Sequence, residues 1–362
     1  MRPAVAHLVT VLILLIVSVL LATRPYYNWD MFRYMALALD DGSIPFMDIH
    51  HQVFFDAKEQ MPTEDFAAVT LRRPELLDDP EKFRETLRYF QVKPGYVLVV
   101  KALYKLGVPL TAATYLPSIA AYFLLGCLLL FTQRDLAPII SSLSVLIIMA
   151  LPPVVEGARL STPDMLATLL VMTGLLLFFS GKTSWALGAL LLSVTIRPDA
   201  ILPGFLLISV GLVTRRLKLI PAVAGFMGLT ITMLVCLGDL NLLPEYLFTG
   251  SDYSPEWSWA KAAGEYRDSL FSGLRSWVTT KALTGFMASS VYLYLNRSNS
   301  IRENPWKAMV LLALVLYPLR FLLHPQMEDR FLLVPYVIVA MAFIRWLNSA
   351  SFSTQLSSQS RQ

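Results

Sequence analysis

The chain has 362 residues, 56% of them hydrophobic, and a mean hydropathy of +0.56, which is far more apolar than a soluble domain requires and predicts a polytopic membrane protein. A net charge of +4 would suggest a nucleic-acid partner in a soluble chain, but basic loops that set membrane orientation account for it, so no nucleic acid is expected. Cys127 and Cys236 both lie within apolar runs, which excludes a disulfide framework and a thiolate metal site.

The first hydrophobic run extends from about His7 to Thr23, behind the basic residue Arg2. Its length and its positive flank fit both a signal peptide and a membrane helix. A retained membrane helix is favoured, because many further apolar runs follow and because aromatic residues at its exit are typical of a membrane anchor.

The exit of this run, residues 26–34, carries the first carboxylate of the chain, Asp30. Its tyrosines and tryptophan fit an aromatic belt at headgroup level, with Asp30 as a solvated flanking charge. An acid at a membrane exit is also a candidate for a functional site, so both interpretations stay open at this point.

A long loop then extends from Arg24 to Leu110 and holds 13 of the 26 acidic residues of the chain. Loops of this length without regular structure are usually functional or disordered. This one contains helix signals, since Asp79-Pro80-Glu81 starts a helix and apolar residues follow at helical spacing. The sequence predicts short surface helices here and an interfacial helix over residues 96–110.

Further apolar runs predict nine more spans, several shorter than the roughly 20 residues of a full crossing. The runs are 111–131, 137–155, 163–180, 185–196, 199–213, 219–237, 282–296, 306–323 and 331–347. The run 185–196 could merge with the next into one segment. Two spans with Arg197-Pro198-Asp199 at the tip are favoured, because a merger would place the basic residues 215–218 on the opposite side from the other basic loops.

The predicted fold is therefore an all-α polytopic membrane protein of about ten transmembrane helices, with a cytoplasmic N-terminus. The inner segments then hold 11 basic and two acidic residues, and the outer side holds 19 basic and 24 acidic residues. This distribution satisfies the positive-inside rule. The predicted organisation is one membrane-embedded domain over residues 1–347, with outer loops at 24–110 and 238–281 and a polar cytoplasmic tail at 348–362.

The outer side carries most of the possible chemistry. The loop 238–281 is rich in tryptophan and tyrosine, which suits an interfacial lid or a carbohydrate-stacking surface. Three short outer turns each place an acid beside an arginine, and these turns are 156–164, 197–199 and 324–330. Local salt bridges or helix caps would explain any one turn. Together the turns surround one expected outer cavity, where ionisable groups of membrane proteins tend to be functional.

These features resemble the GT-C class of integral membrane glycosyltransferases, in which one span leads to an exit acid, a long outer loop ending in Lys-Pro and a bundle with short outer turns. Residues 87–96, with Lys93-Pro94 and the following Tyr96, are similar to the Tyr-Phe-Glu-Lys-Pro segment of the aminoarabinose transferases and protein mannosyltransferases of that class. Gln91-Val92 stands where those relatives have a glutamate. The turns Thr162-Pro163-Asp164 and Arg197-Pro198-Asp199 also resemble recurring turns of the class.

The resemblance implies transfer of a sugar from a polyprenyl-phosphate-linked donor to a lipid, glycan or protein acceptor on the outer face. Asp30 matches the exit-loop acid of the class and is expected to act as the general base toward an acceptor hydroxyl. Cations are expected to stabilise the leaving phosphate, with Lys93 first. The expected substrate-binding residues are Arg33, Lys93, Tyr96, Arg159, Asp164, Arg197, Asp199 and Arg330.

A divalent metal is a further option, because the first loop contains carboxylates and two adjacent histidines. These residues are Asp40, Asp41, Asp48, His50 and His51. The same residue types are ordinary on a solvated loop, so no metal ligands are assigned and the cofactor is left unknown.

Two other functions remain as alternatives. One is a flippase or transporter of lipid-linked sugars, although no internal repeat is found and the charges lie at the ends of the spans instead of their middles. The other is a polysaccharide polymerase or ligase, which shares the substrate but not the dependence on an exit-loop aspartate. The expected location is a bacterial inner membrane, with membrane lipids as neighbours and the site on the extracytoplasmic face.

Overall fold

The computed structural model describes residues 3–237, 259–279, 281–297, 300–301, 304–323 and 328–359. Their regular structure is helical apart from one isolated bridge between Tyr26 and Leu160, so the all-α prediction is confirmed for this part of the chain. The helices of the first loop are α2 (Trp29–Leu39), α3 (Phe46–Gln60), α4 (Thr63–Thr70), α5 (Pro74–Asp78), α6 (Pro80–Thr86), α7 (Arg88–Gln91) and α8 (Pro94–Lys105).

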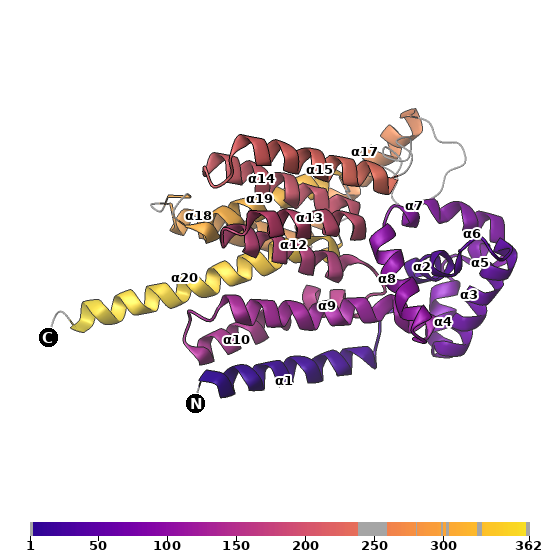
Figure 1. Ribbon diagram of the computed structural model, residues 1–362, viewed down its shortest axis with the longest axis horizontal. Helices are drawn as coiled ribbons and strands as arrows, with labels where there is room; N and C mark the ends of the chain where they lie inside the picture. Colours follow the sequence, from indigo (N-terminus) through magenta and orange to yellow (C-terminus); the bar gives the residue numbers. More distant parts are fainter. Residues whose placement is uncertain are drawn as a thin grey trace.

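The remaining helices form a bundle. They are α1 (Pro3–Ala22), α9 (Leu110–Thr132), α10 (Pro138–Met149), α11 (Pro152–Arg159), α12 (Asp164–Phe179), α13 (Thr183–Ile196), the 3₁₀ turn η1 (Pro198–Ala200), α14 (Ile201–Val213), α15 (Leu219–Leu237), α17 (Trp259–Thr279), α18 (Lys281–Leu295), α19 (Pro305–Leu323), the 3₁₀ turn η2 (Asp329–Leu332) and α20 (Leu333–Gln359). In Figure 1 the long helices follow the long axis of the molecule, α2 to α7 gather at one end, and both termini lie at the other.

Five of the described helices are long and apolar enough to cross a membrane: α1, α9, α15, α19 and α20. A sixth span exists if α10 and α11, which meet at a bend of 63°, are counted together. Ten full spans are not confirmed, because the other four predicted runs form apolar helices of only 10–17 residues: α12, α13, α14 and α18. A helix of this length rises less than the hydrocarbon thickness of a typical bilayer.

The region 185–213 folds as a hairpin of two helices. Gly174 of α12 packs against Leu190 and Ala186 of α13, so these two helices run antiparallel. Gly211, near the end of α14, contacts Phe178 near the end of α12, so α14 runs back in the direction of α12. Proline at position 198 cannot continue the backbone hydrogen bonds of α13, and the chain turns through η1 instead.

The first loop and the bundle each have a large hydrophobic core, and a third, smaller cluster lies between α18, α19 and α20. The loop core is built from α2, α3, α6 and α8 and is closed by the first turns of α9. The bundle core runs through α9, α12, α13, α14, α19 and α20. Of the predicted outer loop 238–281, residues 259–279 form α17, and 238–258 lie outside the described residues together with any lid they contain. The predicted tail from Asn348 continues α20 up to Gln359.

Gly285 on α18 permits a close approach of two tyrosines, from α19 and α20. A Cβ atom at this position would lie 2.1 Å from the Tyr317 hydroxyl oxygen and 3.0 Å from Cε1 of Tyr336. We expect Gly285→Ala to lower the free energy of unfolding by about 1–3 kcal/mol, because the fully buried Tyr317 must move. Thermal unfolding of the purified protein in detergent would measure the change.

The matched control is Gly188→Ala on α13, where an added Cβ meets no atom within 4 Å. This change is expected to be neutral or to stabilise the helix by up to about 1 kcal/mol. Equal stability of the two variants would contradict the packing around Gly285.

Candidate active site

Ion pairs join the first loop to three parts of the bundle at the loop end of the molecule. The participants form a continuous set of four carboxylates and four guanidiniums. We call this set the ionic cluster, and its members are Asp30, Arg33, Asp164, Arg197, Asp199, Arg320, Glu328 and Arg330.

Asp30 lies in the first turn of α2, and its position is set by local structure. The side chain of Asn28 caps this helix by accepting a hydrogen bond from the backbone N–H of Met31 at 3.3 Å. The buried Trp29 and Phe32 fix α2 in the loop core. The Asp30 carboxylate is therefore held at a helix N-terminus, where negative charge is favoured, and about a quarter of it stays exposed.

Arg330 connects this carboxylate to the bundle. Its Nη1 atom lies 3.4 Å from Oδ2 of Asp30 and 3.9 Å from Oδ2 of Asp164, and its Nε atom contacts Glu328. Since Asp30 belongs to the first loop and Asp164 opens α12, one guanidinium holds both parts of the molecule together.

Asp164 is the most deeply buried acid of the cluster, with 3% of its surface exposed. The Thr162 hydroxyl donates a hydrogen bond to Oδ2 at 2.5 Å, and Arg197 forms an ion pair with Oδ1. A buried carboxylate is costly unless its lone pairs are satisfied, and here two arginines and a hydroxyl supply the partners.

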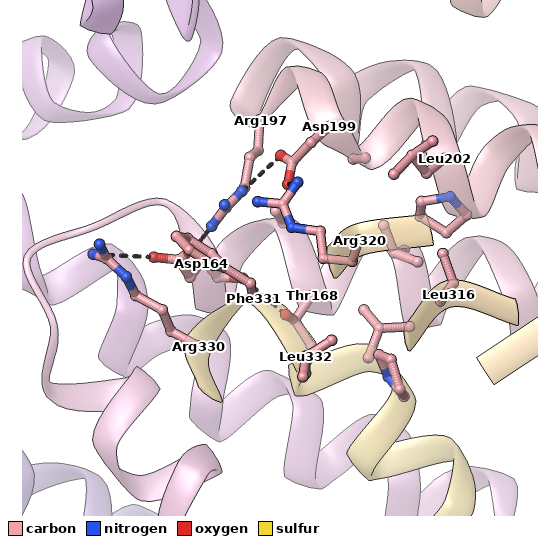
Figure 2. Close-up of a pocket in the computed structure, with 16 residues that line it drawn as sticks. Asp164, Thr168, Arg197, Asp199, Leu202, Leu316, Arg320, Arg330, Phe331 and Leu332 are labelled. Carbon is pink, nitrogen blue, oxygen red and sulfur yellow. Dashed lines mark hydrogen bonds and ion pairs between the residues drawn. The ribbon is translucent and has the colours of Figure 1, made fainter. Parts of the chain in front are cut away.

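Asp199 sits on η1 between two arginines. It accepts a hydrogen bond from Nε of Arg197 at 2.7 Å and forms an ion pair with Arg320 of α19. Figure 2 shows these side chains approaching from η1, α12, α19 and η2 around one pocket. The hairpin tip thereby brings Arg197 between Asp164 and Asp199.

Three guanidiniums surround the ring of Phe331. Their Cζ atoms lie 4.6 Å (Arg197), 4.7 Å (Arg320) and 5.0 Å (Arg330) from the ring centroid. The negative face of an aromatic ring attracts cations, so Phe331 helps to hold three like charges in one small volume.

The pocket beside these arginines has a volume of about 60 Å³, which is room for a few water-sized groups. It is lined by Asp164, Asp199 and the three arginines and by apolar side chains of α12, α14, α19 and α20. The walls include Val171, Leu202, Pro203, Leu316 and Val334. A lining that combines guanidiniums with apolar side chains suits a ligand with an anionic head and a hydrocarbon chain.

Lys93, just before α8, lies on the loop side of the ionic cluster. Its Nζ atom donates a hydrogen bond to the Tyr34 hydroxyl at 3.0 Å and lies 4.6 Å from the centroid of the Phe90 ring. Tyr96 is fully buried behind it, and its hydroxyl donates to the carbonyl of Thr114. Arg33 donates from Nε to the Thr86 hydroxyl at 3.0 Å and lies 3.9 Å from Asp30.

Burial and the charges of the site together shift the pKa values of Asp30 and Lys93 in the first loop. Burial raises the pKa of Asp30, but the charges of Arg330, Lys93 and Arg33 outweigh this effect and leave the pKa below its ordinary range. Burial lowers the pKa of Lys93 to about 7, against the opposing charge of Asp30. At neutral pH Asp30 is therefore an anion, whereas Lys93 is close to its titration midpoint.

Arg159 lies apart from the ionic cluster. Its Nε atom donates to the carbonyl of Arg24 at 2.6 Å, and its own carbonyl accepts from the N–H of Tyr26 at 2.8 Å. These bonds tie the exit of α1 to the end of α11, so the contacts of Arg159 are structural.

The acids and histidines considered for a metal do not converge. Asp41 accepts hydrogen bonds from Ser43, the buried His50 faces the carbonyl of Leu76 at 3.1 Å, and His51 stacks on Phe55. The described residues contain no group of three or more side chains that could hold a metal ion.

Arg320 and Phe331 were missed by the sequence analysis. Arg320 lies two residues after Pro318, inside the apolar run 306–323, for which the sequence predicts only a membrane span. A lone arginine near the end of such a run was the available signal, because ionisable residues in membrane helices are usually functional. Phe331 carried no signal, since one phenylalanine in an apolar helix is ordinary.

No protein-family model, no curated protein and no solved structure matches this chain. The function must therefore be inferred from the geometry of the site itself.

We expect Arg330→Gln to lower the free energy of unfolding by about 2–4 kcal/mol, because it leaves two partly or fully buried carboxylates short of a partner. Adding Asp30→Asn to this variant should cost less than Asp30→Asn costs alone, since the pair is already broken. Chemical or thermal unfolding in detergent would measure all three variants.

Arg267→Gln is the control, because its pair with Asp268 is about 70% exposed and is worth less than about 1 kcal/mol. Strictly additive effects of Asp30→Asn and Arg330→Gln would contradict the bridging contact.

Proposed function

We propose that this chain is a membrane glycosyltransferase that moves a sugar from a polyprenyl-phosphate-linked donor to a lipid, glycan or protein acceptor. The observation that carries the proposal is the position of Asp30. Its carboxylate is partly exposed and lies 3.4 Å from Arg330, which is one of the three arginines around the ring of Phe331. A proton acceptor and a phosphate-binding group thus lie next to each other at one end of a helical bundle.

Transfer of a sugar requires the acceptor hydroxyl to lose a proton while its oxygen bonds to the anomeric carbon. Asp30 is the ionised group at the edge of the site and serves as the general base, an effect typically of about 10²–10⁴-fold. The bond from the anomeric carbon to the phosphate oxygen breaks, and its electron pair remains on the phosphate.

The leaving phosphate gains negative charge in this step. Arg197, Arg320 and Arg330 are held in place by carboxylates and by the Phe331 ring before any ligand binds. Fixed donors of this kind stabilise developing charge without reorganisation, and guanidiniums match phosphate oxygens bidentately. The apolar pocket walls suit the hydrocarbon atoms nearest to the phosphate.

The proposal includes a membrane arrangement with ten crossings, in which the four short apolar helices also traverse a locally thin or protein-lined region. The N-terminus is cytoplasmic, the membrane is a bacterial inner membrane and the ionic cluster faces the extracytoplasmic side. At the opposite end Arg345 pairs with Asp135 at 2.6 Å and Lys307 donates to the carbonyl of Asn296 at 2.8 Å. Basic residues on that side agree with the positive-inside rule.

Single cysteines test this arrangement in a Cys127→Ala, Cys236→Ala background. Asp41→Cys, in the first loop, should react with a membrane-impermeant maleimide in whole cells. Arg215→Cys, between α14 and α15, should react only after permeabilisation. Reaction of both in intact cells would contradict the odd number of crossings, five, that the arrangement places between them.

The enzymatic proposal is tested by sugar transfer from short-chain polyprenyl-phosphate sugars, with purified protein in detergent. We expect Asp30→Asn to reduce the rate by about 10²–10⁴-fold, because the amide cannot accept the proton. Asp41→Asn, an exposed acid of the same loop, should keep the wild-type rate. Unfolding midpoints of both variants establish that the comparison is between folded proteins.

Three outcomes would redirect the assignment. Full transfer by Asp30→Asn would show that Asp30 is not the base. Loss of transfer only when the arginines are substituted would favour a polymerase or ligase. Absence of transfer by the wild type, together with movement of lipid-linked sugars across reconstituted vesicles, would favour a flippase.

A further inference from the structure

Lys93 differs from the arginines beside it in its partners. Each arginine of the ionic cluster has a carboxylate within 4.0 Å, whereas no described residue offers Lys93 a carboxylate at that distance. Its ammonium group lies against the rings of Phe90 and Tyr34, at 4.6 and 5.5 Å from their centroids. Aromatic rings stabilise a cation less than an ion pair does, so the proton on Lys93 is held weakly.

The hydrogen-bond partner of Lys93 suits both protonation states. The Tyr34 hydroxyl accepts from an ammonium group and can donate to a neutral amine without moving. Tyr34 is fully buried and its ring packs edge-on against Phe90 and Tyr96, at 5.1 and 4.7 Å. The site is therefore arranged to keep Lys93 in one position whether or not it carries a proton.

The charges that face Lys93 come from every element around it. On α2 these residues are Asp30 and Arg33, and the hairpin tip adds Arg197 and Asp199. Arg330 of η2 adds a further positive charge, and Tyr96 of α8 is neutral. Among the described residues the ionic cluster has four carboxylates and four guanidiniums, so a protonated Lys93 beside it adds one positive charge. An anionic ligand at the arginines would be balanced by one proton on Lys93.

We propose that Lys93 is the proton-exchanging residue of the site, neutral in part while the arginines hold no ligand and protonated when a phosphodiester of single negative charge binds to them. The inference rests on the proposed function, because the phosphodiester is the chemical group that links polyprenol to sugar in the donor. Donor binding is then coupled to uptake of one proton, and the filled site is electrically neutral.

The coupling has a defined sign. Burial places the pKa of Lys93 at about 7, and a bound anion raises it. As the pH increases above 7, the ligand must bring in a proton that the free protein no longer holds, so its affinity decreases. When binding is coupled to the uptake of one proton, the affinity for the ligand decreases by at most tenfold for each unit of pH.

Calorimetric titration with a farnesyl methyl phosphodiester tests this inference, because the charge of a diester does not change near neutral pH. Titrations at pH 7.5 in two buffers with different ionisation heats give the number of protons taken up. We expect the wild type to take up most of one proton and to lose up to about tenfold in affinity between pH 7.5 and 8.5.

Two substitutions isolate Lys93. Lys93→Arg, which is charged at every pH used, should bind the diester with no proton uptake and with a flat pH profile. Lys93→Met should also show no uptake, with weaker binding than the wild type at pH 6.5 and a smaller difference at pH 8.5. Lys101→Met on α8 is the matched control and should keep the wild-type uptake, and thermal unfolding would verify the fold of each variant.

Proton uptake in Lys93→Arg equal to that of the wild type would overturn the inference, and so would binding to the wild type without uptake. In both cases the donor site would stand. Absence of diester binding to the folded wild type would instead overturn the donor site and the inference together.

Discussion

The contacts of Arg330 with Asp30 and Asp164 are the interaction on which the rest of the site depends. Removing charged groups from water is expensive, and a buried pair repays this cost only when the geometry is complete. Asp30, Asp164 and Asp199 each pair with an arginine from another segment, so the first loop, the hairpin tip, α19 and η2 must adopt one fixed arrangement. A side chain with two charged partners also has little freedom to rotate, so the same contacts fix the side chains of the ionic cluster.

Much of the fold could be predicted from the sequence, because membrane helices are recognisable by their apolar composition. Apolar runs located the bundle helices, and Asp79-Pro80-Glu81 predicted the start of α6. The helix predicted over residues 96–110 is α8, which ends earlier, at Lys105. The number of full crossings was not readable in the same way. Pro198 and Gly181, the latter with a φ of 80°, end the helices before them. Neither residue indicates whether the shortened helix still crosses a bilayer.

The sequence predicted the outer turns that carry the site residues, but it did not predict which of these residues form ion pairs with each other. An acid next to an arginine in the sequence suggests a local pair, and Arg197 with Asp199 and Arg330 with Glu328 form such pairs. The pairs of Asp164 with Arg197, 33 residues away, and of Arg330 with Asp30, 300 residues away, were not predicted. Such choices depend on the rotation of each helix about its axis, which packing decides. Arg159 illustrates the limit, because its turn satisfies the same pattern while its guanidinium bonds a backbone carbonyl at the α1 exit.

The separation between Asp30 and Arg330 is 300 residues, and the chain is made from its N-terminus. At about 5–20 residues per second, the ribosome needs roughly 15–60 seconds to supply the arginine after the aspartate has emerged. Throughout that interval Asp30 lacks its contact with Arg330, and the first loop is held on the bundle by the apolar contacts of its core with α9 and by the bridge from Tyr26 to Leu160. The contact between Asp30 and Arg330 therefore forms only after most of the bundle has been synthesised, and a chain that ends before residue 330 leaves the Asp30 carboxylate without this partner.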